Sequence, residues 1–172
     1  MSLPRPLDFE QVLRDHLKPI YNFIYRLIGD AAAADDVTQE TFIKAWRAAD
    51  RYNPEYPLRA WLFTIARNAA TDWLRRKKPL LFSRLGNGDE AFADSLVSPA
   101  VDPETLAATA DEAEELLQQL DGLPLATRTI VTLHVVNELS FAEIAGIVGE
   151  PLNTVKSRYF RAIRELRRRP TR

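Results

Sequence analysis

The chain has 172 residues, a formal net charge of −1, 46% hydrophobic and 27% charged residues, and no cysteine, which excludes disulfides and thiolate chemistry. Its two histidines, His16 and His134, lack the spacing of metal ligands, so we expect no metal and no cofactor. No apolar run approaches membrane-spanning length, and the first residues, MSLPRPLDFE, lack the apolar core of a signal peptide. We therefore expect a cytoplasmic protein without membrane insertion.

Charge is unevenly distributed along the chain. Arg59–Lys78 holds six basic residues and one acidic residue, and Leu152–Arg172 holds eight basic residues and one acidic residue. Between them, Pro79–Leu125 holds ten acidic residues and one basic residue. The near-zero total therefore hides two basic zones that flank an acidic one.

The first part of the chain reads as three helices. Apolar residues recur at helical spacing over Asp8–Ile28, and further helices are predicted over about 33–49 and 58–78. The stretch RYNPEYP, with two prolines, separates the second from the third, and Pro79 follows the third.

The second part resumes helical periodicity after an acidic, turn-rich segment. Near Asp111 the leucines recur again, and helices are predicted over about 125–137, 140–148 and 153–169. No strand-like alternation occurs. The sequence predicts an all-α fold of two small helical domains, 1–78 and 111–172, joined by an acidic linker over 79–110.

The segment LSFAEIAGIVGEPLNTVKSRYFRAI is typical of a helix-turn-helix. Ser140 and Glu143 form an S-x-x-E capping box, and Gly149 suits a sharp turn because glycine tolerates positive φ. Pro151 prevents the first helix from continuing, and Asn153 is placed to cap the second.

A helical wheel divides that second helix into two faces. One face is apolar and predicts packing: Val155, Tyr159, Ala162, Ile163 and Leu166. The opposite face is polar and basic: Asn153, Thr154, Ser157, Arg161, Arg164 and Arg168, with Lys156 and Phe160 on one flank and Arg158 on the other. A basic face is sometimes merely solvated. Its coincidence with the helix-turn-helix features favours DNA binding, with Phe160 placed to touch a thymine methyl.

Two N-terminal features allow two interpretations each. Trp61 lies on a polar face of the third helix, where it either stacks unpaired bases together with Tyr52 and Tyr56 or anchors the preceding loop. The seam of Asp36, Glu40, Lys44 and Arg47 on the second helix is either a stabilising surface row or part of a face offered to a partner. Spacing alone leaves both alternatives open.

Three motifs in order carry a resemblance to a known family. DDVTQETFIKAW (Asp35–Trp46), RAWLFTIARNAATDWLRR (Arg59–Arg76) and the helix-turn-helix resemble an extracytoplasmic-function (ECF) sigma factor, the small two-domain class of the sigma-70 family. Each motif is degenerate alone, but their order and separation are specific. The resemblance covers nearly all of the chain except the linker.

The resemblance implies three sets of binding residues. Contacts to the β′ clamp helices of RNA polymerase fall on Asp36, Gln39, Glu40 and Lys44. Recognition and opening of the −10 promoter element fall on Tyr52, Asn53, Trp61, Asn68 and Asp72. Recognition of the −35 element in the major groove falls on Thr154, Lys156, Ser157, Arg158, Phe160 and Arg161. The family often has a basic residue at the position of His134, where a mostly neutral histidine is a weaker partner for phosphate.

The implied function is promoter-specific transcription initiation without catalysis. The partners would be core RNA polymerase, through its β′ clamp helices and β flap, promoter DNA, and an anti-sigma factor, with no small-molecule substrate. The acidic linker would pass through polymerase channels otherwise used by nucleic acid, either mimicking phosphates or serving as a solvated tether. The alternatives are a sigma-like decoy that sequesters an anti-sigma factor and a stand-alone helix-turn-helix regulator.

Overall fold

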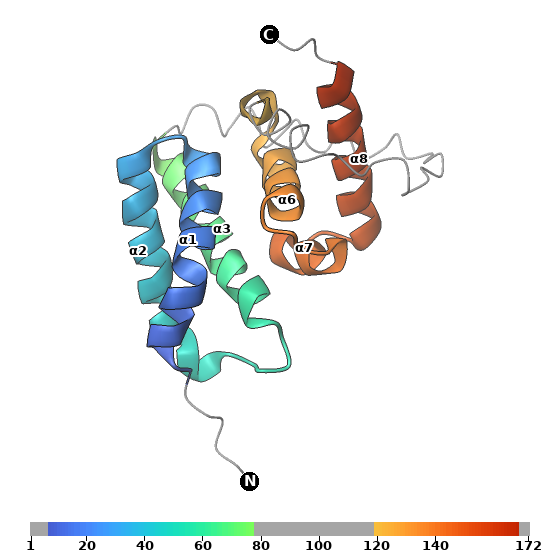
Figure 1. Cartoon of the computed structure of the whole chain (residues 1–172). Helices are drawn as coiled ribbons and strands as arrows, with labels where there is room; N and C mark the ends of the chain where they lie inside the picture. The colour runs from blue at the N-terminus through green and yellow to red at the C-terminus, as the bar shows by residue number, and fades with distance from the viewer. Residues whose placement is uncertain (1–6, 78–118, 169–172) are drawn as a thin grey trace.

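The computed structural model describes residues 7–77 and 119–168, and all regular structure in these two ranges is helical (Figure 1). The prediction of an all-α fold with an N-terminal and a C-terminal helical unit is confirmed. The N-terminal unit contains α1 (Phe9–Ile28), α2 (Ala31–Ala48), the 3-10 turn η1 (Ala49–Arg51) and α3 (Leu58–Lys77). The C-terminal unit contains the 3-10 turn η4 (Leu120–Gly122), α6 (Leu125–Val135), α7 (Phe141–Val148) and α8 (Leu152–Arg168).

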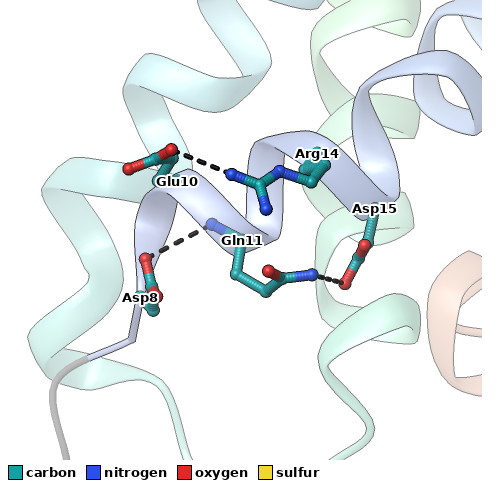
Figure 2. Close-up of polar contacts among 5 residues, drawn as sticks. All are labelled: Asp8, Glu10, Gln11, Arg14 and Asp15. Carbon is teal, nitrogen blue, oxygen red and sulfur yellow. Dashed lines mark hydrogen bonds and ion pairs between the residues drawn. The ribbon is translucent and has the colours of Figure 1, made fainter.

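Local chemistry fixes both ends of α1. The Asp8 carboxylate accepts a hydrogen bond from the Gln11 backbone N–H at 3.3 Å, and Gly29 ends the helix with φ of 74°. Figure 2 shows this cap beside two pairs one turn apart, Arg14 with Glu10 at 2.9 Å and Gln11 with Asp15 at 2.8 Å. Because these pairs are exposed, each contributes only a few tenths of a kcal/mol.

The N-terminal unit is a three-helix bundle in which α1, α2 and α3 pack against one another. Phe23 of α1 meets Phe63 of α3 edge to face, with ring centroids 5.3 Å apart. Small side chains let α3 approach its neighbours closely, since four of its alanines are fully buried: Ala60, Ala66, Ala69 and Ala70. This tight packing leaves the outer face of α2 and the loop before α3 at the surface.

Caps and glycine define the short helices of the C-terminal unit. The Ser140 hydroxyl accepts from the Glu143 N–H at 3.2 Å while the Glu143 carboxylate accepts from the Ser140 N–H at 2.8 Å, so the predicted capping box is confirmed. Gly149 ends α7 with φ of 73°. The prediction that Asn153 caps α8 is wrong: α8 begins at Leu152, so Asn153 lies within the first turn. The Val155 N–H instead donates to the carbonyl of Pro151 at 3.1 Å.

The two units touch each other. α3 packs against α7, and α1 packs against α6 (Figure 1). At this contact the Tyr56 hydroxyl lies only 2.8 Å from the place a Cβ would take at Gly146 of α7. The loop before α3 is thereby held against the helix-turn-helix. The predicted domain limits remain a prediction, and the acidic linker over 79–110 lies outside the described residues.

Candidate nucleic-acid interface

The recognition helix α8 has the two faces that the wheel predicts. All five residues of the predicted packing face are buried: Val155, Tyr159, Ala162, Ile163 and Leu166. On the other side, Lys156, Arg164 and Arg168 are exposed, and Thr154, Ser157 and Arg161 are half-buried. The polar face therefore lies at the surface of the C-terminal unit, with short polar side chains in the first two turns of α8 and arginines farther along the helix.

Two predicted DNA-contacting residues already have contacts within the protein. Arg158 lies 3.4 Å from the carboxylate of Glu150, in the turn between α7 and α8. The half-buried ring of Phe160 packs on Phe141 and Tyr159, with centroids 5.8 and 5.3 Å apart. Both side chains thus stand at the edge of the polar face and also help to join α8 to the rest of the unit.

An aromatic cluster connects α6, α7 and α8: His134, Phe141, Tyr159 and Phe160. His134 of α6 stacks on Phe141 of α7 at 4.2 Å and meets the edge of Tyr159 of α8 at 4.7 Å. Burial raises the pKa of Tyr159 above its usual value, with a smaller opposing effect from Arg167. The sequence signal for this cluster was weak, because its members come from three separate helices.

The loop before α3 is held by two tyrosines. The Tyr52 hydroxyl donates to the carbonyl of Tyr56 at 2.6 Å, and the Tyr52 ring contacts Trp61 with centroids 5.0 Å apart. Desolvation raises the pKa of Tyr52. Trp61 is half-buried against the core, so it anchors the loop as one of the two interpretations expects. Stacking on unpaired bases remains a prediction for this pair.

The other predicted −10 residues lie in the open. Asn53 is exposed, and its side-chain oxygen accepts from the Glu55 N–H at 3.0 Å, which closes a turn at the tip of the loop. Along α3, the exposed Asn68 accepts from Arg67 at 3.1 Å, and the exposed Asp72 lies 4.0 Å from Arg75. The loop and the outer side of α3 therefore both present exposed polar groups, with basic residues toward the end of the helix.

Part of the predicted charged seam of α2 is present as an ion pair, and exposed apolar residues lie beside it. Glu40 pairs with Lys44 at 2.7 Å and lies 3.9 Å from Arg76, so it is directed toward α3. A separate stripe, which we call the α2 stripe, points outward and consists of Asp36, Gln39, Ile43 and Trp46. Ile43 and Trp46 are 48% and 65% exposed, so two large apolar side chains of this stripe are not covered by the described part of the chain.

The described ranges were compared with the requirements of a metal site and of a membrane span. Residues 7–77 and 119–168 contain no group of three or more His, Cys, Asp or Glu that could bind a metal ion. Within the same ranges, none of the helices has both the length and the apolar character needed to span a membrane.

Known proteins share both the sequence and the fold of this chain. The family model for Sigma-70 region 2 matches residues 12–79, and that for Sigma-70, region 4 matches residues 113–166. The ECF RNA polymerase sigma factor SigW of Bacillus subtilis (strain 168) is 30% identical over 163 residues, covering 93% of this chain and 87% of that protein.

Two solved structures resemble most of the chain. The sigma factor RpoE in complex with the anti-sigma factor NepR, from Bartonella quintana, has a TM-score of 0.66 at 28% identity, covering 92% of this chain and 96% of that one. CnrH in complex with the cytosolic domain of CnrY has a TM-score of 0.64 at 25% identity, covering 92% and 84%. The chain belongs to the ECF sigma factors of the sigma-70 family.

Proposed function

We propose that this protein is an alternative sigma factor, which binds core RNA polymerase in the cytoplasm and directs it to promoters with a particular pair of −10 and −35 elements. One observation carries the proposal: region 2 and region 4 occur in order, and each unit presents a polar surface that its own core does not use. The protein would supply binding and specificity, while the chemistry of RNA synthesis belongs to the polymerase.

The α2 stripe is the proposed contact with the β′ clamp helices. An exposed tryptophan and isoleucine flanked by Asp36 and Gln39 provide an apolar centre with a polar rim, which is the usual anatomy of a protein interface. Glu40 and Lys44 pair with each other beside the stripe, where they support it and border the contact. Trp46 is the expected energetic centre, because tryptophan is enriched among interface hot spots.

The loop before α3 and the outer side of α3 are the proposed −10 reader. Tyr52 and Trp61 hold the loop in shape, so Asn53 at its tip meets an incoming base without having to be ordered first. Asn68 and Asp72 continue the polar surface along α3. Capturing a base outside the duplex costs a few kcal/mol, which contacts in such a pocket offset.

The first three turns of α8 are the proposed −35 reader. Thr154, Lys156, Ser157 and Arg161 lie on its outward side, where a helix in the major groove meets base edges and phosphates. Arg158 and Phe160 border this surface and meet DNA only at its margin, since Glu150 and the aromatic cluster hold them.

Promoter binding requires the two units to separate. The −10 and −35 elements lie about 25 base pairs apart, which is roughly 85 Å at 3.4 Å per pair. A 20-residue helix spans only about 30 Å, and the contact between α3 and α7 keeps the two readers adjacent. We propose that an anti-sigma factor controls this protein by covering these surfaces, as suggested by the anti-sigma partners in the two structural neighbours.

In vitro transcription tests the proposal. Core RNA polymerase with this protein is presented with a promoter library randomised at both elements, and the transcripts are sequenced. Specific initiation above that of core alone is expected. Binding to an anti-sigma factor without initiation would indicate a decoy, and duplex binding without polymerase would indicate a stand-alone regulator; either result would overturn the proposal.

A further inference from the structure

His134 occupies a junction in the C-terminal unit. It lies in the last turn of α6, next to the turn that leads to the capping box of α7. Its Nδ1 lies 2.8 Å from the carbonyl oxygen of Leu139, and its ring is stacked on Phe141 at 4.2 Å with 19° between the planes. One side chain thus joins the end of α6 to the start of α7.

The hydrogen bond satisfies a backbone group that is costly to leave unpaired. Leu139 is 1% exposed, and its N–H already donates to the carbonyl of Leu133 at 3.1 Å. A buried carbonyl without a partner costs about 1–3 kcal/mol, so Nδ1 must carry a proton and donate to Leu139. The residue before Leu139, Glu138, has a φ of 53° that non-glycine residues rarely adopt.

The ring contacts extend this junction to the recognition helix. His134 meets the edge of Tyr159 at 4.7 Å, and Tyr159 in turn contacts Phe160 at 5.3 Å. Phe141 touches both Tyr159 and Phe160. A change at His134 therefore reaches the turn of α8 that carries Ser157 and Arg161. With Nδ1 donating to Leu139, Nε2 of a neutral ring carries no proton to donate to a phosphate, and only a doubly protonated imidazole could make that contact.

We propose that His134 is a positioning residue for −35 recognition, which sets the placement of α8 through the aromatic cluster and does not contact phosphate. This inference rests on the proposed −35 role of α8. Loss of one aromatic contact or of its hydrogen bond is expected to reduce discrimination between matched and altered −35 elements about two- to tenfold. The strength of the purely electrostatic contacts should not change.

Two substitutions separate the ring from its hydrogen bond. His134→Phe keeps a stacked ring and removes the donor, whereas His134→Asn keeps a donor near the position of Nδ1 and removes most of the ring. Each variant is assembled with core polymerase, and binding is measured to a promoter enriched by the wild-type holoenzyme and to the same promoter with an altered −35 element. Thermal unfolding establishes that each variant is folded. If either fails to fold, Phe141→Leu, which removes the stacking partner and keeps an apolar side chain, replaces it.

Salt dependence at pH 6 and pH 8 distinguishes positioning from phosphate contact. A phosphate contact by a protonated imidazole would contribute about 0.9 to the slope of log K against log salt, and loss of that contribution in the variants at either pH would overturn the inference. Unchanged −35 discrimination in folded variants would also overturn it. Arg161→Ala is the control: if it too leaves −35 discrimination unchanged, the −35 assignment of α8 fails, whereas a loss for Arg161→Ala alone rejects only the role of His134.

Discussion

The helices of the two units are stabilised by different features. The N-terminal unit uses helices of 18 to 20 residues, whereas α6 and α7 of the C-terminal unit have 11 and 8 residues. Long helices gain enough packing to specify themselves through apolar periodicity, while helices this short depend on caps and side-chain junctions. The capping box of α7 and the hydrogen bond from His134 are such devices.

The two units also differ in where the residues that pack lie relative to the residues proposed to bind a partner. In the N-terminal unit the α2 stripe and the loop before α3 lie away from the buried alanine-rich interface. In the C-terminal unit, α8 alone supplies both the packing face and the proposed reading face. Changes in the N-terminal core should therefore alter stability and leave polymerase binding through the α2 stripe intact, whereas changes under α8 should alter stability and −35 recognition together.

The largest expected effect is on the N-terminal core. Phe63→Ala removes a side chain that is 1% exposed and packed edge to face on Phe23, so it should lower the free energy of unfolding by about 3–5 kcal/mol. Urea denaturation measures this, with Tyr25→Ala, at a 44% exposed aromatic, as the matched control. A loss under about 1 kcal/mol for Phe63→Ala would contradict the described core.

The α2 stripe should affect only polymerase binding. Trp46→Ala should weaken binding to core polymerase by about 2–4 kcal/mol, and Gln39→Ala should weaken it less, because buried aromatic anchors dominate interfaces. Binding is measured by titration of labelled protein with core polymerase, and thermal unfolding should be nearly unchanged at so exposed a position. Equal binding of Trp46→Ala and wild type would place the polymerase contact elsewhere.

Arg161→Ala should produce the reverse pattern. The loss of an arginine contact in the major groove should weaken the binding free energy for the −35 element by about 1–3 kcal/mol, which lowers −35-dependent initiation. Binding to core polymerase should stay intact. Initiation at promoters with intact and altered −35 elements gives the measurement. If core binding fell instead, the division of roles between the units would be wrong.

Substitutions of helix caps compare the two units through smaller losses of stability. Ser140→Ala breaks the capping box of an eight-residue helix and should cost about 1 kcal/mol of stability. Asp8→Ala removes a single cap bond from a 20-residue helix, without the reciprocal bond of a capping box, and should cost less. Thermal unfolding of the two variants gives the order, and a reversed order would contradict the dependence of short helices on caps.

The smallest effect concerns pH. Burial lowers the pKa of His16 below its usual 6.5, and Arg59 adds to this against the opposing charge of Asp15. The folded protein therefore favours the neutral ring, so stability is present above pH 6.5 and falls as the pH drops below it. His16→Gln should reduce that slope between pH 7 and 5.5 in denaturation curves. An unchanged slope would mean that groups other than His16 cause the pH dependence of stability.

Local patterns predicted much of this structure. Apolar spacing gave the complete packing face of α8, and the S-x-x-E pattern gave the cap of α7, since both depend on residues within a few positions of each other. The start of α8 was misjudged because Pro151 and Asn153 are both plausible first residues of a helix, and local preference does not choose between them.

Contacts between distant segments could not be predicted in the same way. The pairing of Glu40 with Arg76, the approach of Tyr56 to Gly146 and the stacking of His134 join separate helices, and no periodicity along one helix encodes them. The exposure of Trp46 likewise depends on which side of α2 the other helices cover. The roles of the surfaces came from the resemblance to the family. The fold shows which side chains of these surfaces are exposed.

The separation of two readers on one sigma factor is tested most directly by a promoter library randomised at both elements and transcribed with wild-type protein and with Arg161→Ala. We expect wild type to enrich defined bases at both elements, and Arg161→Ala to lose enrichment at −35 while retaining it at −10. Loss of enrichment at both elements together, or enrichment at neither element with wild type, would contradict this expectation.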